Sequence, residues 1–507
     1  MLILKEVQLL PEIFLGISII YLIIHGTFIS VNDKYLLIQN SILYLSVLII
    51  MMFCFLLFNN NIKFNEYYIF NNTIIVDYLS FLSKFWIGLI SIFCLLMIQR
   101  YLNVQKINYF EYSILILFAL LGIFFICSSN DLITAYLAIE LQSLSFYILA
   151  AFKKDSSFSV DSGLKYFILG AFSSSLFLFG SSILYGISGS TNFEDFKNLF
   201  YLTWADTSLY SFSTNIILDA GLIQFALVFI FVSLLFKLAL APFHLWSPDI
   251  YEGSPTSSTF FFAVVPKLAI FILLIRIFYI SFYEFINKWR YYIVIIAVLT
   301  IIVGSFAGVE QRKLKSLLAY SSISHMGYTL IAFSTGTFEG LQMLFCYLFI
   351  YMGAGLCIWS IFLSLQLKNK HIKKQNKDLA DLSLLSKANY ILALFFATVL
   401  LSIAGLPPMI GFLVKIGIFL VSIEAFMYFI AIISILCSVI STFYYIRIIK
   451  IMYFENYLAG RLYYPIKAHS SILIVFLFYF LIFLFINPTL VYLLSYKTTL
   501  LLSMTIV

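Results

Sequence analysis

The stretch that decides the fold is residues 221–246, GLIQFALVFIFVSLLFKLALAPFHLW, in which one lysine stands inside an apolar run. Lys237 lies five residues before Pro242, and proline interrupts a helix because it has no backbone N–H to donate. The pattern recurs at residues 406–420, LPPMIGFLVKIGIFL, where Lys415 lies eight residues after Pro407. A basic group at membrane depth beside a helix break is typical of a charged pathway rather than of an anchor.

The composition predicts an integral membrane protein. The chain has 507 residues, of which 63% are hydrophobic and 10% charged, and its mean hydropathy is +1.04. One soluble core cannot hide that much apolar surface from water. Apolar stretches long enough to cross roughly 30 Å of hydrocarbon recur along the chain, including single long spans over residues 390–420 and 471–494. We therefore expect an all-α polytopic membrane protein with about fourteen transmembrane helices.

Several kinds of site are not indicated by the sequence. The six cysteines are scattered without a CxxC pair, so neither an iron-sulfur cluster nor a zinc site is predicted. No dinucleotide-binding or Walker motif occurs, so no nucleotide site is expected. The formal charge of +7 is explained by membrane topology and lipid contacts, and no nucleic acid partner is expected.

The basic residues are distributed unevenly between the loops. Of the 30 Lys and Arg residues, eighteen fall in loops on one side of the predicted bundle, six on the other side and six within helices. Cytoplasmic loops carry an excess of basic residues, so the lysine-rich loop at residues 368–387 is expected to face the cytosol-equivalent compartment. In a mitochondrion this compartment is the matrix, and both termini would face the intermembrane space.

The two lysine-bearing, proline-broken segments also indicate how the chain is organised. They lie five predicted helices apart and therefore enter the membrane from opposite sides, which is the pattern of an inverted repeat. The predicted units are three N-terminal helices at 1–105, a five-helix unit at 109–281, a second inverted unit at 290–455, and a C-terminal helix at 470–507.

Charged side chains inside the helices need partners, because each costs about 2.5–3.5 kcal/mol at the centre of a membrane helix. Glu140 is the only acidic residue well inside the central helices, which makes it the expected partner of Lys237 or Lys165. An ion pair that only pins two helices together is the alternative interpretation. Lys267 is expected to face the bundle interior, where a desolvated lysine can release its proton.

Two histidines and two further basic residues complete the candidates. His325 lies in a serine-rich helix near Ser324 and Tyr320, so it is either part of a proton relay or an ordinary hydrogen-bonded core histidine. His244 follows Pro242 and is expected to fix the turn at the helix break or to lie on a proton exit. Lys84 and Arg276 are expected to extend to a membrane interface.

Four motifs together resemble a known family. They are NDLITAYLAIELQSL at 130–144, GLKYFILG at 163–170, KLALAPFHLWSPDIYEGSP at 237–255 and LPPMIGFLVK at 406–415. These stretches resemble the NADH dehydrogenase subunit 2 family, the antiporter-like membrane-arm subunits of mitochondrial respiratory complex I. The resemblance spans nearly the whole chain, but the last helices and the lysine-rich loop match less sharply.

The resemblance implies proton translocation driven by ubiquinone reduction elsewhere in the NADH:ubiquinone oxidoreductase complex. Glu140 and Lys237 would form the first half-channel pair, and Lys165 would modulate it. Lys267 would be the central proton carrier, followed by His325 and by Lys415 on the exit side.

The family also implies partners and a location. This chain would bind no cofactor itself, with FMN, iron-sulfur clusters and ubiquinone held by other subunits of the complex. Its expected neighbours are subunits 4L and 4 and lipids such as cardiolipin, in the mitochondrial inner membrane. The alternatives are an Mrp-type sodium/proton antiporter subunit, a scaffold that does not pump, and a chloroplast-type homologue.

Overall fold

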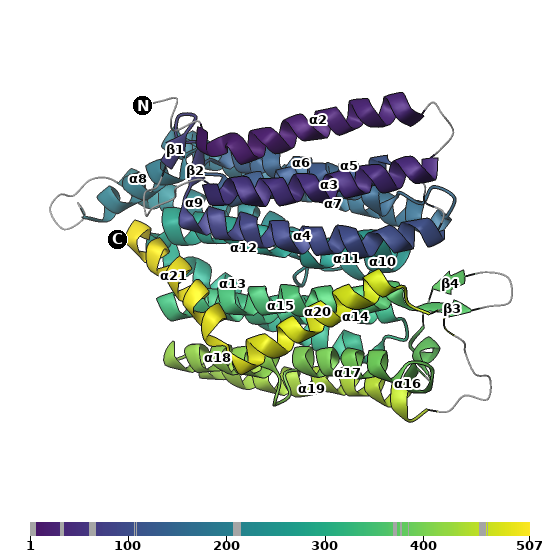
Figure 1. Ribbon diagram of the computed structural model, residues 1–507. Helices are drawn as coiled ribbons and strands as arrows, with labels where there is room; N and C mark the ends of the chain where they lie inside the picture. Colours follow the sequence, from purple (N-terminus) through teal and green to yellow (C-terminus); the bar gives the residue numbers. More distant parts are fainter. Residues whose placement is uncertain are drawn as a thin grey trace.

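The protein is a bundle of long helices that run side by side (Figure 1). The structure, a computed structural model, describes residues 7–30, 35–59, 67–105, 107, 109–205, 214–368, 373–375, 378–383, 385–455, 463 and 465–506. Almost all of the described backbone is helical, and the described strands form only two short antiparallel hairpins, β1–β2 and β3–β4.

The elements of the first half, in chain order, are η1 (Val7–Leu9), α2 (Leu10–Ser30), α3 (Tyr35–Asn59), β1 (Tyr67–Ile69), β2 (Ile74–Val76), α4 (Tyr78–Gln105), α5 (Glu111–Ser128), α6 (Leu132–Ala150), α7 (Ser157–Ser188), α8 (Phe193–Ala205), α9 (Thr214–Leu238), α10 (Trp246–Gly253), α11 (Thr256–Val264), α12 (Pro266–Ile275), the π-helix η3 (Arg276–Ser281) and η4 (Tyr283–Phe285). Those of the second half are α13 (Ile286–Glu310), α14 (Leu314–Ser334), α15 (Phe338–Ser364), β3 (Gln366–Lys368), β4 (Lys373–Gln375), η5 (Leu379–Leu382), α16 (Leu385–Ala388), α17 (Tyr390–Ala404), α18 (Ile410–Glu424), α19 (Tyr428–Tyr453), α20 (Ala468–Ile486) and α21 (Thr489–Ile506).

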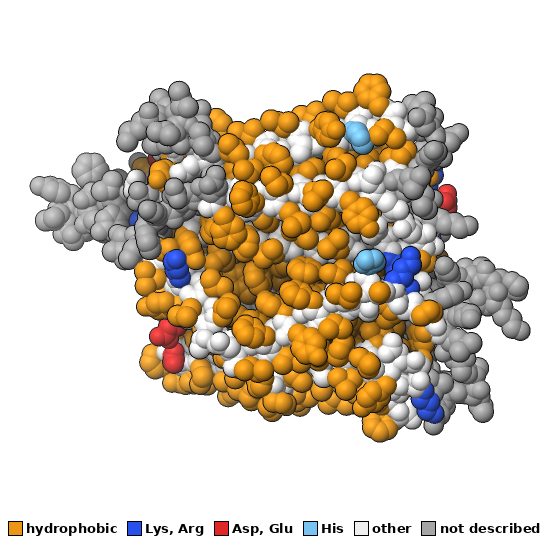
Figure 2. Space-filling view, viewed as in Figure 1, with side chains coloured by type: hydrophobic (Ala, Val, Ile, Leu, Met, Phe, Trp, Pro, Cys, Tyr) orange, Lys and Arg blue, Asp and Glu red, His pale blue; other side chains and the backbone are white. Residues whose placement is uncertain are grey.

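The surface has the pattern of a membrane-embedded bundle. Hydrophobic side chains cover the middle of the face seen in Figure 2, and the charged side chains lie near its two ends. Within the described residues, 12 helices are long and apolar enough to cross a membrane. α14 and the α17–α18 pair occupy the two other predicted regions, so the prediction of an all-helical polytopic membrane protein is confirmed.

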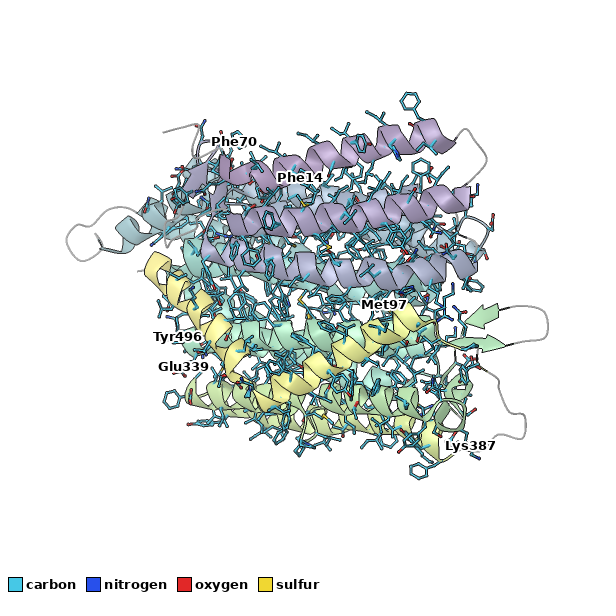
Figure 3. All side chains as sticks on the ribbon, viewed as in Figure 1. Phe14, Phe70, Met97, Glu339, Lys387 and Tyr496 are labelled. Atoms are coloured by element: carbon cyan, nitrogen blue, oxygen red, sulfur yellow. The ribbon has the colours of Figure 1, made fainter. Side chains whose placement is uncertain are left out.

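The two ends of the bundle differ in what they carry. α2 begins and α21 ends at the left end of the view in Figure 1, whereas β3 and β4 lie at the right end. Side chains fill the spaces between the helices, and Glu339 and Lys387 mark the left and right ends in Figure 3. Lys370 and Lys377 of the lysine-rich loop lie outside the described residues.

Both predicted helix breaks are present, and both have the same hydrogen-bond pattern. α9 ends before Ala239, whose φ is 59°, and the N–H of Leu240 donates to the carbonyl of Leu235 at 3.1 Å. α17 ends before Gly405, whose φ is 80°, and the N–H of Leu406 donates to the carbonyl of Leu401 at 3.2 Å. A left-handed residue followed by such a bond is a common way to end a helix. The prolines that follow keep each helix from continuing.

The C-terminal region departs from the prediction of one helix over residues 471–494. The structure has two helices there, α20 and α21, which meet at Asn487 and Pro488. Pro488 cannot donate the backbone hydrogen bond that would continue α20, so the chain turns and α21 starts at the next residue. The single long span predicted over residues 390–420 likewise divides into α17 and α18.

The most buried helices lie at the centre of the bundle. Nearly all residues of the segment Thr256–Ser281 are buried inside the protein, and so are most residues of α15. α13 and α14 pack closely, because a Cβ at Gly304 would lie 2.6 Å from the backbone nitrogen of Ser324. Small residues permit this approach between membrane helices. The packing therefore fixes the position of α14, which carries His325.

Of two buried ion pairs, the first joins two N-terminal helices and the second joins the start of α4 to the core. Lys84 on α4 lies 2.5 Å from Glu12 on α2, with both side chains at most 3% exposed. Arg276 lies 2.8 Å from Asp77 and also donates to the carbonyl of Cys127. The prediction that Lys84 and Arg276 reach an interface is therefore wrong. Their acidic partners come from distant parts of the chain, 72 and 199 residues away.

We expect Lys84→Ala to destabilise the protein by about 3–5 kcal/mol, because it leaves the Glu12 carboxylate buried without its partner. The double variant Glu12→Gln, Lys84→Met should recover much of this loss, since neither buried charge remains. Unfolding in mixed detergent micelles, titrated with dodecyl sulfate, measures both. Equal destabilisation by the single and double variants would contradict the pairing.

Candidate functional site

The centre of the site is a buried lysine that is bonded to a tyrosine. Lys267 is the second residue of α12, directly after Pro266, and is only 5% exposed. Its ammonium nitrogen donates to the hydroxyl of Tyr351 on α15 at 2.8 Å. The buried ammonium group is thus paired with a neutral oxygen and not with a carboxylate. Its burial agrees with the predicted position of Lys267 in the bundle interior.

His325 lies next to this pair and is held between two more tyrosines. Its Nδ1 is 2.5 Å from the hydroxyl of Tyr347 and its Nε2 is 3.1 Å from that of Tyr445. Its ring centroid lies 5.5 Å from that of Tyr351. A neutral imidazole has one N–H and one lone pair, so one tyrosine hydroxyl accepts a hydrogen bond and the other donates one.

Lys415 lies in α18, after the second helix break, and contacts the end of α17 before that break. Its ammonium nitrogen donates at 2.7 Å to the carbonyl of Ala404, the last residue of α17. The last carbonyls of a helix have no partner within the helix, and they attract cations. The ring of Tyr328 lies 5.3 Å from the same nitrogen and 6.3 Å from the ring of His325. An aromatic ring therefore lies near both Lys415 and the histidine.

Glu140 and Lys237 do not contact each other directly. The four ion pairs among the described residues do not include Glu140, which instead accepts from Ser143 at 3.2 Å. Lys237 approaches the hydroxyl of Tyr147 at 3.5 Å. Glu140, Ser143 and Tyr147 share one face of α6, because they follow helical spacing. In place of the predicted direct pair, Glu140 contacts the hydroxyl of Ser143 and Lys237 contacts that of Tyr147.

Lys165 lies apart from the other predicted site residues. Its ammonium group pairs with Asp249 on α10 at 2.7 Å, and the two side chains are 58% and 57% exposed. Glu140 is therefore not its partner, contrary to one of the two pairings predicted from the sequence. The carboxylate of Asp249, in the motif that follows the helix break, lies closer to it.

His244 lies in the unwound stretch between α9 and α10. Its carbonyl accepts from the backbone and the hydroxyl of Ser247, at 2.9 and 3.1 Å, which supports the predicted role in the turn. Burial lowers the pKa of the His244 imidazole below its ordinary value, so the ring is neutral at pH 7. Tyr320, expected near His325, faces His244 instead, with ring centroids 6.4 Å apart.

A cavity lies between the first two lysines. Lys237 and Lys267 both line it, together with the polar side chains of Gln142, Ser143 and Tyr251. Its volume of about 20 Å³ admits a single water molecule. The site is thus a row of ionisable and hydroxyl groups that extends from α6 to α18.

The sequence pattern did not single out the tyrosines that connect this row. Tyr347 and Tyr351 are four residues apart in α15 and so share one face of an otherwise apolar helix. Tyr147 lies two turns after Glu140 on α6. This helical spacing is a usable signal, but tyrosine is so frequent in this chain, with 35 residues, that it was not distinctive.

Comparison with known proteins shows the family of this chain. A family model described as the membrane part of the NADH:quinone oxidoreductase/Mrp antiporter proteins matches residues 129–441. The chain belongs to this family. The match includes every predicted site residue, from Glu140 to Lys415.

Individual relatives cover nearly the whole chain. NADH-quinone oxidoreductase subunit N of Pelagibacter ubique is 42% identical over 450 residues, which cover 88% of this chain and 89% of that protein. NADH-ubiquinone oxidoreductase chain 2 of Marchantia polymorpha is 38% identical over 495 residues, covering 97% and 98%. The predicted resemblance to the subunit 2 family is therefore confirmed.

Solved structures share the fold. A chain of respiratory complex I from Thermus thermophilus with bound aureothin superposes with a TM-score of 0.76 at 25% identity, covering 95% of this chain and 98% of that one. A chain of the Mrp complex from Dietzia sp. has a TM-score of 0.79 at 16% identity and covers 97% of each chain. This second likeness is one of fold alone.

We expect Gly405→Ala to displace Lys415 from the carbonyl of Ala404. The new Cβ would lie 2.7 Å from Cδ of Lys415, and the left-handed backbone costs an L-residue about 1–2 kcal/mol. Gly186→Ala is the matched control, because its Cβ would meet nothing within 4 Å. Dodecyl sulfate titration compares their stabilities, and a loss no larger for Gly405→Ala than for the control would contradict this geometry.

Proposed function

We propose that this chain is a proton-translocating membrane subunit of a NADH:quinone oxidoreductase complex. The observation that carries the proposal is the buried set of Lys267, Tyr351 and His325, in which ionisable and hydroxyl groups lie in contact at the centre of a membrane bundle. Ionisable residues inside membrane bundles are costly and mark ion and proton pathways. Family membership supports the same function.

Each predicted site residue has a proposed role in this pathway. Glu140 and Lys237 exchange a proton through Ser143 and Tyr147, and the water-sized cavity leads on to Lys267. His325 receives the proton from Lys267 and passes it to Lys415. Lys165, with Asp249, modulates the first pair from outside the row.

Energy for the transfer would come from quinone reduction in other subunits of the complex. Moving one charge against 100 mV costs about 2.3 kcal/mol, which is comparable to the gain or loss of one buried hydrogen bond to a charged group. We propose that this chain binds no cofactor itself and that FMN, iron-sulfur clusters and ubiquinone belong to its partners. Its proposed protein neighbours are subunits 4L and 4.

The proposed location is the mitochondrial inner membrane, with both termini on the intermembrane-space side. The excess of basic residues in loops on one side of the bundle supports this orientation. The domain division predicted from the sequence, with inverted units at 109–281 and 290–455, remains part of the proposal. The similar hydrogen-bond patterns at the two helix breaks are consistent with it.

An Mrp-type sodium/proton antiporter subunit is the second candidate. Its support is the shared fold, whereas the relatives at 42% and 38% identity both carry NADH:quinone oxidoreductase names. Purification of the native assembly decides between the two, because only the first function requires flavin and iron-sulfur subunits to copurify with this chain.

We expect Lys267→Ala to lower the number of protons moved per electron, because no carrier then remains between Lys237 and His325. The measurement is proton uptake by vesicles containing the assembled complex, recorded together with NADH oxidation. Lys313→Ala is the control, since it removes an ammonium group that is 49% exposed and pairs with Glu252 at the surface. An unchanged ratio in assembled Lys267→Ala complex would refute the proposed function.

We expect Tyr351→Phe to slow proton translocation by roughly tenfold, because an unpaired buried donor costs about 1–3 kcal/mol. The aromatic ring stays, so assembly should be preserved. Tyr279→Phe removes a buried tyrosine hydroxyl that donates to the carbonyl of Phe333 outside the row, and it should leave translocation intact. Equal rates in the two variants would show that Tyr351 only fills space.

A further inference from the structure

A separate groove opens on the flank of the bundle, between α9 and α13. Its free volume is about 70 Å³. The residues that line it come from α9, η3, η4 and α13 and are Gln224, Leu227, Val228, Phe231, Val232, Phe278, Phe285, Lys288, Trp289, Tyr292 and Ile296. None of these residues belongs to the row of the candidate functional site.

The groove has a polar end and an apolar end. α8 precedes α9 and packs against η3 and η4, which precede α13, so α9 and α13 begin at the same end of the bundle. Gln224 and Lys288, the lining residues nearest that end on their helices, are polar. Val232 and Ile296, eight residues further along each helix, are apolar. The groove therefore extends for about 12 Å from polar to apolar surroundings.

The shape of the groove is supported by its aromatic residues. Nε1 of Trp289 donates to the carbonyl of Phe282 at 3.0 Å, which fixes the indole. Its ring packs on Phe278, with centroids 5.6 Å apart, and Phe278 in turn packs on Phe231 at 5.4 Å. The wall is thus held in place by the protein itself.

Lys288 gives the polar end a positive charge. Its side chain is exposed, and none of the four ion pairs within the described residues involves it. Glu284, four residues earlier, does not line the groove. Lys288 lies in the first turn of α13, near the start of the membrane-spanning segment Tyr283–Glu310. Tryptophan and tyrosine at such a position typically mark the level of the lipid headgroups.

We propose that this groove binds one acyl chain of an anionic phospholipid, whose phosphate contacts Lys288. An apolar channel with a single cation at the headgroup level matches an amphiphile with a hydrocarbon tail and a negative head. The amide of Gln224 can donate to the same head or its ester oxygens. The proposal gives the lipid partner expected from the sequence a defined site, and it does not depend on proton translocation.

Photo-crosslinking of the intact complex tests this proposal. The complex is placed in phosphatidylcholine nanodiscs that contain phosphatidylglycerol with a diazirine in its acyl chain, and the labelled peptides are mapped by mass spectrometry. Label is expected on residues 224–232 and 285–296. Lys288→Ala should reduce it roughly fivefold, the effect of one lysine near an anionic lipid, and Lys288→Arg should preserve it.

A second variant tests the groove rather than the charge. Val228→Trp fills the channel and should remove the label. Ile295→Trp should not, because Ile295 lies in α13 outside the groove lining and is 59% exposed. Equal labelling by a diazirine phosphatidylcholine, insensitive to Lys288→Ala, would show ordinary bilayer contact and overturn the proposal. Crosslinks between these peptides and a neighbouring subunit would overturn it as well.

Discussion

The free-energy cost of a positive charge in the membrane interior is the constraint on which this structure depends. Every cation inside the described helices that lacks access to the surface meets an oxygen, and these cations fall into two groups. Lys84 and Arg276 face carboxylates. Lys237, Lys267 and Lys415 face neutral oxygens, from two tyrosine hydroxyls and one backbone carbonyl. All five are basic residues in apolar helices, and the kind of oxygen that each one contacts divides them into the two groups.

This difference has a chemical meaning. A carboxylate stabilises only the charged form of its partner, so the pairs at Lys84 and Arg276 serve as fixed connections between helices. A hydroxyl or a carbonyl can bond to an ammonium group and to a neutral amine alike. We infer that the lysines with neutral partners are the ones able to change protonation without losing their contacts. The helix break at Ala404 is part of this design, because it supplies the free carbonyl that Lys415 uses.

Much of the fold was predictable from the sequence, and less of the site. Long apolar stretches identified the membrane helices, and Pro242 and Pro407 marked both breaks, because these signals are local. The partners of Lys84 and Arg276 were not predictable, since they are residues far away in sequence. The same reason hid the tyrosines around His325, which lie on α15 and α19. Glu140 and Lys237 do not pair directly, because each contacts a hydroxyl on α6 instead.

The environment of His325 also determines how a proton can pass through its imidazole ring. Each ring nitrogen has a tyrosine hydroxyl within hydrogen-bonding distance. A proton that arrives at one nitrogen can therefore be matched by a proton that leaves from the other, without rotation of the ring. After each passage the imidazole is left in the opposite tautomer. The nitrogen that received the proton now carries an N–H and cannot accept another. The ring must therefore rotate, or exchange protons with its neighbours, to restore the first tautomer before the next proton follows in the same direction.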